Sequence, residues 1–170
     1  MPNIAQNTGV LKLTTRGDRE IVMTREFNAP RTLVWDAFTK PELLKRWLYG
    51  LPDWSLAECE MGKKVGDRYR YLWRGPNGEQ MGAGGVIREI IPPQRIVLTE
   101  RFDDPWYPGE MIGTIELVER DGKTTLTQTL LYESREAREV VLKSPAEEGV
   151  GMSYDRLAGV LATLAHECAS

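Results

Sequence analysis

Residues 24–48, TREFNAPRTLVWDAFTKPELLKRWL, decide the fold that we expect for this chain. Apolar and polar side chains alternate up to Phe27, which is typical of a half-buried strand. Apolar residues then recur at helical spacing between residues 33 and 38, which predicts a short amphipathic helix. Thr39 and Glu42 have the spacing of a capping box and predict a second short helix. Two short helices so close together leave no room for a long crossover, so the pattern disfavours a doubly wound parallel sheet.

The middle of the chain has the pattern of an antiparallel sheet. The pairs Asn77-Gly78 and Asp121-Gly122 are typical of tight hairpin turns. Glycines at 82, 84 and 85 inside one segment predict a bulge or a bend in that strand. With the strand that ends at Phe27, six further segments bring the expected number of strands to seven: 54–61, 68–73, 79–91, 95–102, 111–118 and 124–132.

Two helices are expected to close the chain. Ser134 can cap a short helix that runs to about residue 143, and Ser144-Pro145-Ala146-Glu147 has the pattern of another capping box. From Val150 to Cys168 apolar residues step by three and four, which predicts a long amphipathic helix that lies on the inner face of the sheet. For the glycines of this helix at 149, 151 and 159, we favour close helix–sheet packing over space for a ligand.

The expected fold class is α+β with a helix-grip architecture. In it, a curved antiparallel sheet of about six or seven strands wraps around the long C-terminal helix, and two short helices follow the first strand. Residues 1–18 contain no clear period, so we expect a flexible tail there and a single domain over residues 19–168.

Three segments resemble a known family: REFNAPRTLVWDAFTKPELLKRW (25–47), GDRYRYLWRGPNGEQMGAGGVIREIIPPQRIVLTERF (66–102) and GVGMSYDRLAGVLATL (149–164). They are similar to the activator of Hsp90 ATPase homologue 1-like family of the START-like (SRPBCC) superfamily, and the resemblance covers about residues 20–165. It implies a deep, mostly apolar cavity between the sheet and the last helix. Members of the superfamily bind lipids, hormones or polyketides there, and some catalyse aromatisation or cyclisation. The family has no common catalytic motif.

The candidate ligand-binding residues are aromatic, polar or flexible side chains expected near such a cavity. Tyr69, Tyr71 and Trp73 share one face of a strand, where ordinary core packing is the alternative. Trp106 and Tyr107 lie in a proline-flanked loop that is either a lid or a loop folded onto the core. The complete set of cavity and lid candidates is Tyr69, Tyr71, Trp73, Met81, Glu100, Trp106, Tyr107, Met152 and Arg156.

Composition argues against several functional classes. The net charge of −3 and a pI near 5.4 disfavour nucleic-acid binding. A single histidine, His166, leaves no multi-histidine metal site, and we expect neither a metal nor a cofactor. No apolar run is long enough to span a membrane and no signal peptide is visible, so we expect a cytoplasmic protein. The cysteines, Cys59 and Cys168, are then two ordinary reduced thiols.

The leading hypothesis is therefore a protein that binds a small apolar or amphipathic ligand. The first alternative is a cyclase- or dehydratase-type enzyme in which Glu100, Tyr71 or Arg156 transfers protons. The second is a chaperone-interaction module. The co-chaperone that names the family has a separate Hsp90-binding domain for which we expect no room here, so an Hsp90-type chaperone is not the partner that we favour. Pairing of strand edges could make a homodimer, although nothing in the sequence requires one.

Overall fold

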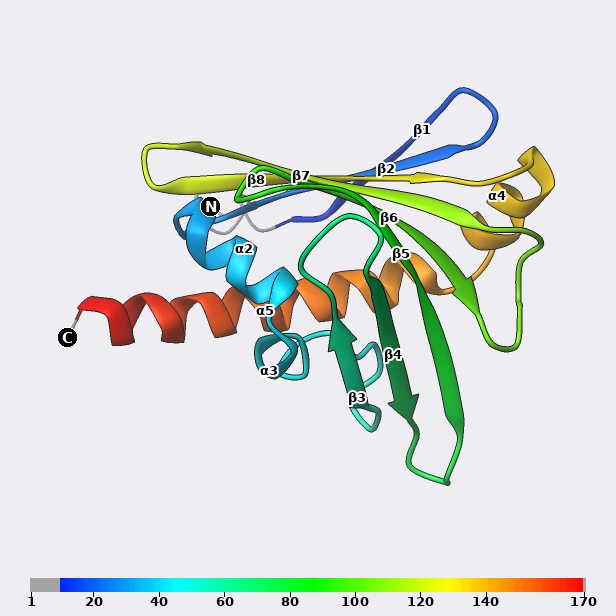
Figure 1. Cartoon of the computed structure of the whole chain (residues 1–170), viewed down its shortest axis with the longest axis horizontal. Helices are drawn as coiled ribbons and strands as arrows, with labels where there is room; N and C mark the ends of the chain where they lie inside the picture. Colours follow the sequence, from blue (N-terminus) through cyan, green and yellow to red (C-terminus); the bar gives the residue numbers. More distant parts are fainter. Residues whose placement is uncertain (1–9, 170) are drawn as a thin grey trace, which may run out of the picture.

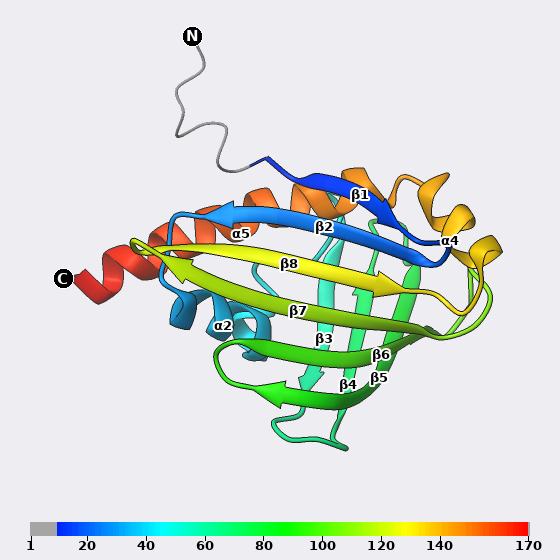
Figure 2. The same cartoon turned by 90° about the horizontal axis from the view of Figure 1, so that it is seen from above.

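The computed structural model describes residues 10–169, and this part of the chain forms one eight-stranded antiparallel sheet (Figures 1 and 2). The strand order is β1-β2-β8-β7-β6-β5-β4-β3, so only the step from β2 to β8 joins strands that are distant in sequence. The strands are β1 (Lys12–Arg16), β2 (Glu20–Phe27), β3 (Ser55–Met61), β4 (Arg68–Arg74), β5 (Gln80–Ile91), β6 (Arg95–Phe102), β7 (Met111–Arg120) and β8 (Lys123–Leu131).

The sheet bends sharply where β5 crosses β6. A Cβ atom on Gly85 would lie 2.0 Å from the carbonyl oxygen of Thr99, so only glycine allows the two backbones to approach this closely. The register then shifts between Ile87 and Glu89, which marks a bulge. As a result β3 and β4 descend steeply from the rest of the sheet in Figure 1, and the bend that the glycines predicted is confirmed.

Four helices are described, and the longest fills the concave side of the sheet. They are α2 (Arg31–Thr39), α3 (Pro41–Leu44), α4 (Arg135–Leu142) and α5 (Ala146–Ala169). In Figure 1, α5 runs below the sheet from α4 past α2 and continues beyond the end of the β7–β8 hairpin. Tyr154, Leu157 and Leu161 of its apolar stripe are buried against the sheet and α2. The expected helix-grip fold is thus confirmed.

The N-terminal region differs from the expected tail. Residues 1–9 lie outside the described residues, but Lys12–Arg16 forms the edge strand β1 and pairs with β2. Within this strand only Leu13 packs against the apolar core, together with the preceding Leu11, and the other side chains of the strand face solvent. The strand depends on backbone pairing with β2, and a search for hydrophobic periodicity in the sequence cannot detect such pairing.

The helix caps agree only in part with the sequence. Ser134 caps α4 as expected, because its hydroxyl accepts from the amide of Ala137 at 3.0 Å. The capping box at Thr39 is wrong, since its hydroxyl donates to the carbonyl of Trp35 within α2 and Lys40 precedes α3 without a side-chain cap. The box at Ser144 is also incomplete. Its hydroxyl accepts from the amide of Ala146, whereas a capping box requires the amide of Glu147, three residues after the serine.

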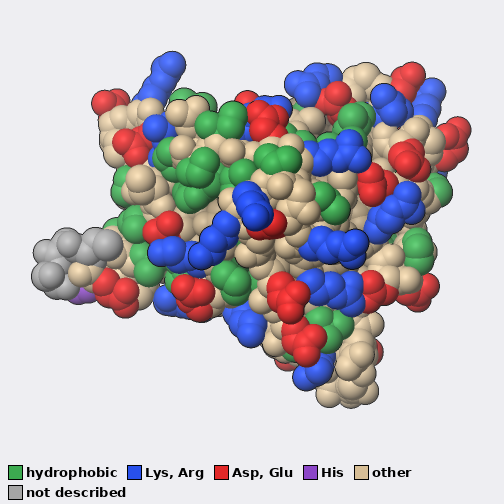
Figure 3. Space-filling model, viewed as in Figure 1, with side chains coloured by type: hydrophobic (Ala, Val, Ile, Leu, Met, Phe, Trp, Pro, Cys, Tyr) green, Lys and Arg blue, Asp and Glu red, His purple; other side chains and the backbone are tan. Residues whose placement is uncertain are grey.

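The expectation of close packing at the three helix glycines is wrong. A Cβ atom at Gly149, Gly151 or Gly159 would meet nothing within 4 Å, so the sheet does not require their missing side chains. No helix in residues 10–169 is both long enough and apolar enough to cross a membrane. Basic and acidic side chains are interspersed over the face seen in Figure 3, without a single-sign field that would suit a polyanion.

Candidate ligand cavity

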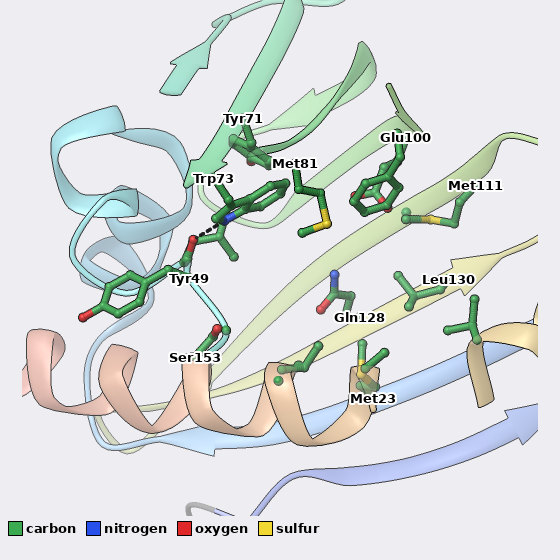
Figure 4. Close-up of a pocket in the computed structure, with 18 of the residues that line it drawn as sticks. Met23, Tyr49, Tyr71, Trp73, Met81, Glu100, Met111, Gln128, Leu130 and Ser153 are labelled. Atoms are coloured by element: carbon green, nitrogen blue, oxygen red, sulfur yellow. Dashed lines mark hydrogen bonds between the residues drawn. The ribbon is translucent and has the colours of Figure 1, made fainter. Parts of the chain in front are cut away.

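A cavity of about 470 Å³ lies between the concave face of the sheet and the first half of α5. Six strands, β2 and β4 to β8, contribute lining residues, and loops 48–54 and 103–110 and the helices α2 to α5 complete the wall. Figure 4 shows side chains from the sheet and Ser153 from α5 around this common space. The volume is within the range of ordinary small-molecule sites.

The wall on the β4 side is a row of aromatic rings. Tyr69, Tyr71 and Trp73 alternate along the strand and therefore point to one side of it. Their ring centroids are 5.1 and 5.6 Å apart, and Phe102 continues the row 6.4 Å from Trp73. The indole of Trp73 donates to the carbonyl of Leu48 at 2.7 Å, which fixes this ring in place.

The loop between β6 and β7 places its two aromatic residues differently. Tyr107 is buried, and its ring lies 6.0 Å from Phe102 and 5.3 Å from Tyr132 in edge-to-face contacts. Trp106 is 39% exposed and packs on Tyr107 at 5.0 Å. Both residues line the cavity, so the loop supplies one ring inside and one at its border.

Glu100 is the one acidic side chain in the cavity lining, which contains no lysine, arginine or histidine. Its Oε1 accepts a hydrogen bond of 3.2 Å from the hydroxyl of Tyr107. Burial raises the pKa of Glu100 to about 7, and the bond from Tyr107 opposes part of this rise. Near neutral pH the carboxyl group is therefore divided between its charged and neutral forms.

The neighbouring phenols stay neutral at ordinary pH. Burial and the charge of Glu100 raise the pKa values of Tyr69, Tyr71, Tyr107 and Tyr132. Tyr69 donates its hydroxyl to the carbonyl of Thr99, whereas the hydroxyls of Tyr71 and Tyr132 have no hydrogen-bond partner among the described residues. These two phenols are therefore available to a bound molecule.

The opposite wall adds one amide. The side-chain oxygen of Gln128 on β8 accepts from the hydroxyl of Tyr154 on α5, which ties the sheet to the helix across the cavity. Because this bond uses the oxygen, the amide NH2 of Gln128 is the group left to a ligand. Met23, Met111 and Leu130 surround it in Figure 4 and are apolar.

Residues 28–162 match the family model described as Activator of Hsp90 ATPase homolog 1-like protein. The chain belongs to this family. Its helix-grip fold is that of the START-like superfamily of ligand-binding domains. No functionally curated protein matches the chain.

Solved structures of similar proteins share the fold over nearly their whole length. A protein from Rhodobacter sphaeroides is 28% identical, with a TM-score of 0.85 over 91% of this chain and 99% of that one. A protein from Chromobacterium violaceum is 26% identical, with a TM-score of 0.72 over 85% of this chain and 98% of the other. An AHSA1-like protein from Aeromonas hydrophila has a TM-score of 0.65 at 17% identity, over 82% of this chain and 94% of its own, and shows the fold alone.

In this family member, the cavity lining contains most of the candidates expected from the sequence. These are Tyr69, Tyr71, Trp73, Met81, Glu100, Trp106 and Tyr107. Met152 and Arg156 do not line it, although both are on α5. The guanidinium of Arg156 instead binds the carbonyls of Tyr49 and Gly50 and lies 3.9 Å from the Tyr49 ring centroid. Arg156 therefore holds loop 48–54 against the helix.

The sequence alone did not indicate several cavity residues. Among these are Met23, Gln128, Leu130, Tyr132, Ser153 and Tyr154. Parity along β8 was a usable signal. Gln128 lies two residues after the buried Leu126, so both side chains point to the same, inward face of the strand. Ser153 lies three residues after Val150 and four before Leu157, so helical spacing places it on the buried stripe of α5, but its small polar side chain did not mark it as a cavity residue.

A second hollow of about 690 Å³ adjoins the cavity and shares Trp54, Met81, Trp106 and Ala146 with it. Its lining includes Asp103 and Asp104 and no basic residue. Asp103 forms an exposed two-armed ion pair with Arg70, which lowers the pKa of Asp103, whereas Asp104 has no ion-pair partner in the described part of the chain. We call this hollow the acidic mouth.

Within residues 10–169 no group of three or more histidine, cysteine, aspartate or glutamate side chains is arranged to hold a metal ion. The thiol of Cys59 is half-buried, and burial raises its pKa to about 11. A thiol that is protonated at neutral pH is a poor nucleophile. The chemistry available in this region is therefore that of Glu100 and the surrounding phenols.

Proposed function

We propose that this protein binds one small, largely apolar molecule in the cavity between the sheet and α5. The observation that carries the proposal is a preformed space of about 470 Å³ in which aromatic and aliphatic walls surround only a few polar groups. This composition is typical of small-molecule sites, where apolar contact supplies affinity and a few polar groups fix orientation. Glu100, Tyr71, Tyr132 and Gln128 are the orienting groups.

Membership of a START-like family supports the same proposal by analogy of fold, since the superfamily consists of ligand-binding domains. The aromatic row from Tyr69 to Phe102 favours a ligand with a flat or ring-containing body, since edge and offset contacts between rings add to simple burial. The hydroxyls and the carboxyl group lie on the sheet side, so the polar end of the ligand would face β6 and β8.

One observation favours a second candidate, an enzyme that moves protons. Glu100 has a pKa near 7, as a general acid or base at neutral pH requires, and its bond to Tyr107 orients it. Arg156 would play no part, because it is occupied by loop 48–54. If a bound compound is identified, its turnover by wild type and by Glu100→Gln would separate catalysis from simple binding.

Calorimetric titration with 2-(2-naphthyl)ethanol, a neutral compound of suitable size, tests the binding proposal. Leu130 lines the cavity, and its neighbour Leu131 points to the other face of β8. Leu130→Trp should fill the space and weaken binding by about tenfold or more, whereas Leu131→Trp should bind like the wild type. Near-ultraviolet circular dichroism verifies that both variants fold.

Native mass spectrometry of gently purified protein is the companion measurement, with any released molecule identified after denaturation. We expect one small molecule per chain or measurable binding of the naphthyl alcohol. Bare protein together with no binding of the alcohol or of its charged naphthyl analogues would overturn the proposal. Equal binding by the two tryptophan variants would instead place the probe outside the cavity.

A further inference from the structure

Glu100 is a half-buried carboxyl group that forms no ion pair within the described residues. Every described arginine or lysine that makes an ion pair makes it with another acid, and the nearest one in sequence, Arg101, is exposed and pairs with Glu110 at 3.5 Å. A carboxylate removed from water without a counter-charge is costly, and it is normally neutralised by a proton or by a partner. The structure holds this carboxyl group facing the empty part of the cavity, where a ligand could supply that partner.

The surroundings of Glu100 also suit a cation. Tyr69, Tyr71, Tyr107 and Tyr132 are all close enough for its charge to act on them. All four phenol rings line the same space, and the faces of aromatic rings attract ammonium groups. An anion would meet the opposite conditions, because the lining offers it a like charge and no basic side chain.

The hollow that adjoins the cavity carries the same sign. The acidic mouth is lined by Asp103 and Asp104, and only Asp103 is neutralised by Arg70. A hollow with one sign of charge raises the local concentration of small ions of the opposite sign. This feature is independent of Glu100, since it lies on the outer side of Trp106 and Met81, which border both spaces.

We infer that the cavity selects small monocationic amines with an apolar, ring-containing body, and that Glu100 is their counter-ion. The ammonium group would bind the carboxylate and lie against the phenol rings, while the body occupies the apolar space towards α5. This inference rests on the proposed function and specifies its ligand class. It excludes fatty acids and other anionic amphiphiles as preferred ligands.

The test is a matched set of three probes: 2-(2-naphthyl)ethylamine, 2-(2-naphthyl)ethanol and 2-naphthylacetate. They share one ring system and nearly one size, and they differ in carrying a positive charge, no charge or a negative charge. At pH 8 the amine should bind wild-type protein about ten- to a hundredfold more tightly than the alcohol, as expected for a hydrogen bond to a charged group. The naphthylacetate should bind more weakly than the alcohol.

Glu100→Gln keeps the shape of the side chain and removes its charge. We expect this variant to lose the preference for the amine, so that the amine and the alcohol bind it with affinities within about threefold of each other. The matched control is Glu110→Gln, which removes an acid outside the lining that pairs with Arg88 and Arg101. This control should retain the full preference for the amine.

The pH dependence is a second readout. The amine stays protonated from pH 5 to 8, and burial holds the pKa values of the four facing tyrosines above their ordinary range, so Glu100 is the cavity group that titrates. Its free pKa near 7 predicts that amine affinity falls by about tenfold for each pH unit well below that value. Binding of the alcohol should change much less over the same range.

The outcomes separate this inference from the proposed function. If the alcohol binds but the amine binds no more tightly, the inference is overturned and the binding proposal stands. If the amine is preferred equally by wild type and Glu100→Gln, Glu100 is not the counter-ion and the inference is again overturned. If none of the three probes binds and no molecule co-purifies, the proposed function falls and the inference with it.

Discussion

The two ends of the space between the sheet and α5 are built from similar side chains but packed differently. At one end, which we call the solid end, Phe27, Val34, Leu126, Leu157 and Leu161 are no more than 2% exposed and form one continuous core. At the other, the hollow end, an aromatic row surrounds about 470 Å³ of space. Apolar composition therefore does not distinguish a core from a cavity in this molecule.

Polar atoms distinguish the two ends. In the solid end the fully buried hydroxyl of Thr124 donates to the carbonyl of Ala29 at 2.7 Å. It is satisfied by backbone, as buried polar groups in a structural core are. In the hollow end the hydroxyl of Tyr71 lacks a described partner and Glu100 has a single one. Unused hydrogen-bonding capacity beside free space is what a binding site requires.

The largest expected effect comes from truncating one leucine at each end. Leu157→Ala in the solid end should lower the free energy of unfolding by about 2–5 kcal/mol, because the neighbours cannot collapse into the gap. Leu130→Ala in the hollow end should lower it by less than about 2 kcal/mol, since that side chain already borders space. Urea unfolding measures both. Equal losses would contradict the division into a solid and a hollow end.

Glu100→Gln should make the protein more stable at pH 8. Folding raises the pKa of this carboxyl group from its ordinary value of 4.5 to about 7, so the folded state binds more protons than the unfolded state between these values. The contribution of Glu100 to the free energy of unfolding is therefore largest below about pH 4.5. It decreases as the pH rises through 7, by up to about 3 kcal/mol in total.

The measurement is urea unfolding of wild type and Glu100→Gln at several values between pH 5 and 8. The wild-type free energy of unfolding should fall relative to that of the variant as pH rises. Glu110→Gln, which alters a carboxylate outside the cavity, should not change the slope in this way. Parallel curves for wild type and Glu100→Gln would show that the carboxyl group ionises in the folded protein as it does in water.

The sequence predicted the solid end better than the hollow end. Hydrophobic period identified β2, α2 and the stripe of α5, because burial on one face leaves a regular pattern. Hydrophobic period also gives Glu100 the parity of Leu98 and Phe102, in agreement with its place in the cavity lining. It could not assign Arg156, since a position on a helix does not say whether an arginine reaches the cavity or the loop carbonyls of Tyr49 and Gly50.

The edge strand β1 and the capping boxes show the limits of local patterns. β1 forms because β2 offers unpaired backbone groups, which the sequence of residues 12–16 does not report. Thr39 has the correct spacing for a cap, but its hydroxyl bonds back to the carbonyl of Trp35. The size of the cavity was equally hidden, because volume depends on how the two walls are spaced rather than on which residues form them.

Gly85→Ala should destabilise the bend that opens the hollow end. The new Cβ would lie 2.0 Å from the carbonyl oxygen of Thr99, so β5 and β6 would have to separate. We expect a loss of about 1–3 kcal/mol in the free energy of unfolding, as for other overpacked sites. Thermal unfolding and binding of 2-(2-naphthyl)ethanol measure the change. A neutral result would mean that the bend does not depend on this close approach.

The smallest effects are expected for two glycines of α5, of which Gly159 lies beside the solid end and Gly149 beside the hollow end. A Cβ atom at Gly159 or Gly149 meets nothing within 4 Å, but only Gly149 lines the cavity. Gly159→Ala should raise the free energy of unfolding by up to about 1 kcal/mol and leave binding of the naphthyl alcohol unchanged. Gly149→Ala should stabilise by less, because it lies in the first turns of the helix where fraying is easy, and it should weaken binding of the alcohol. If both variants bind the alcohol like wild type, the missing side chain of Gly149 does not provide space for the ligand. The ligand would then occupy the part of the cavity next to the sheet and would not contact α5 at this position.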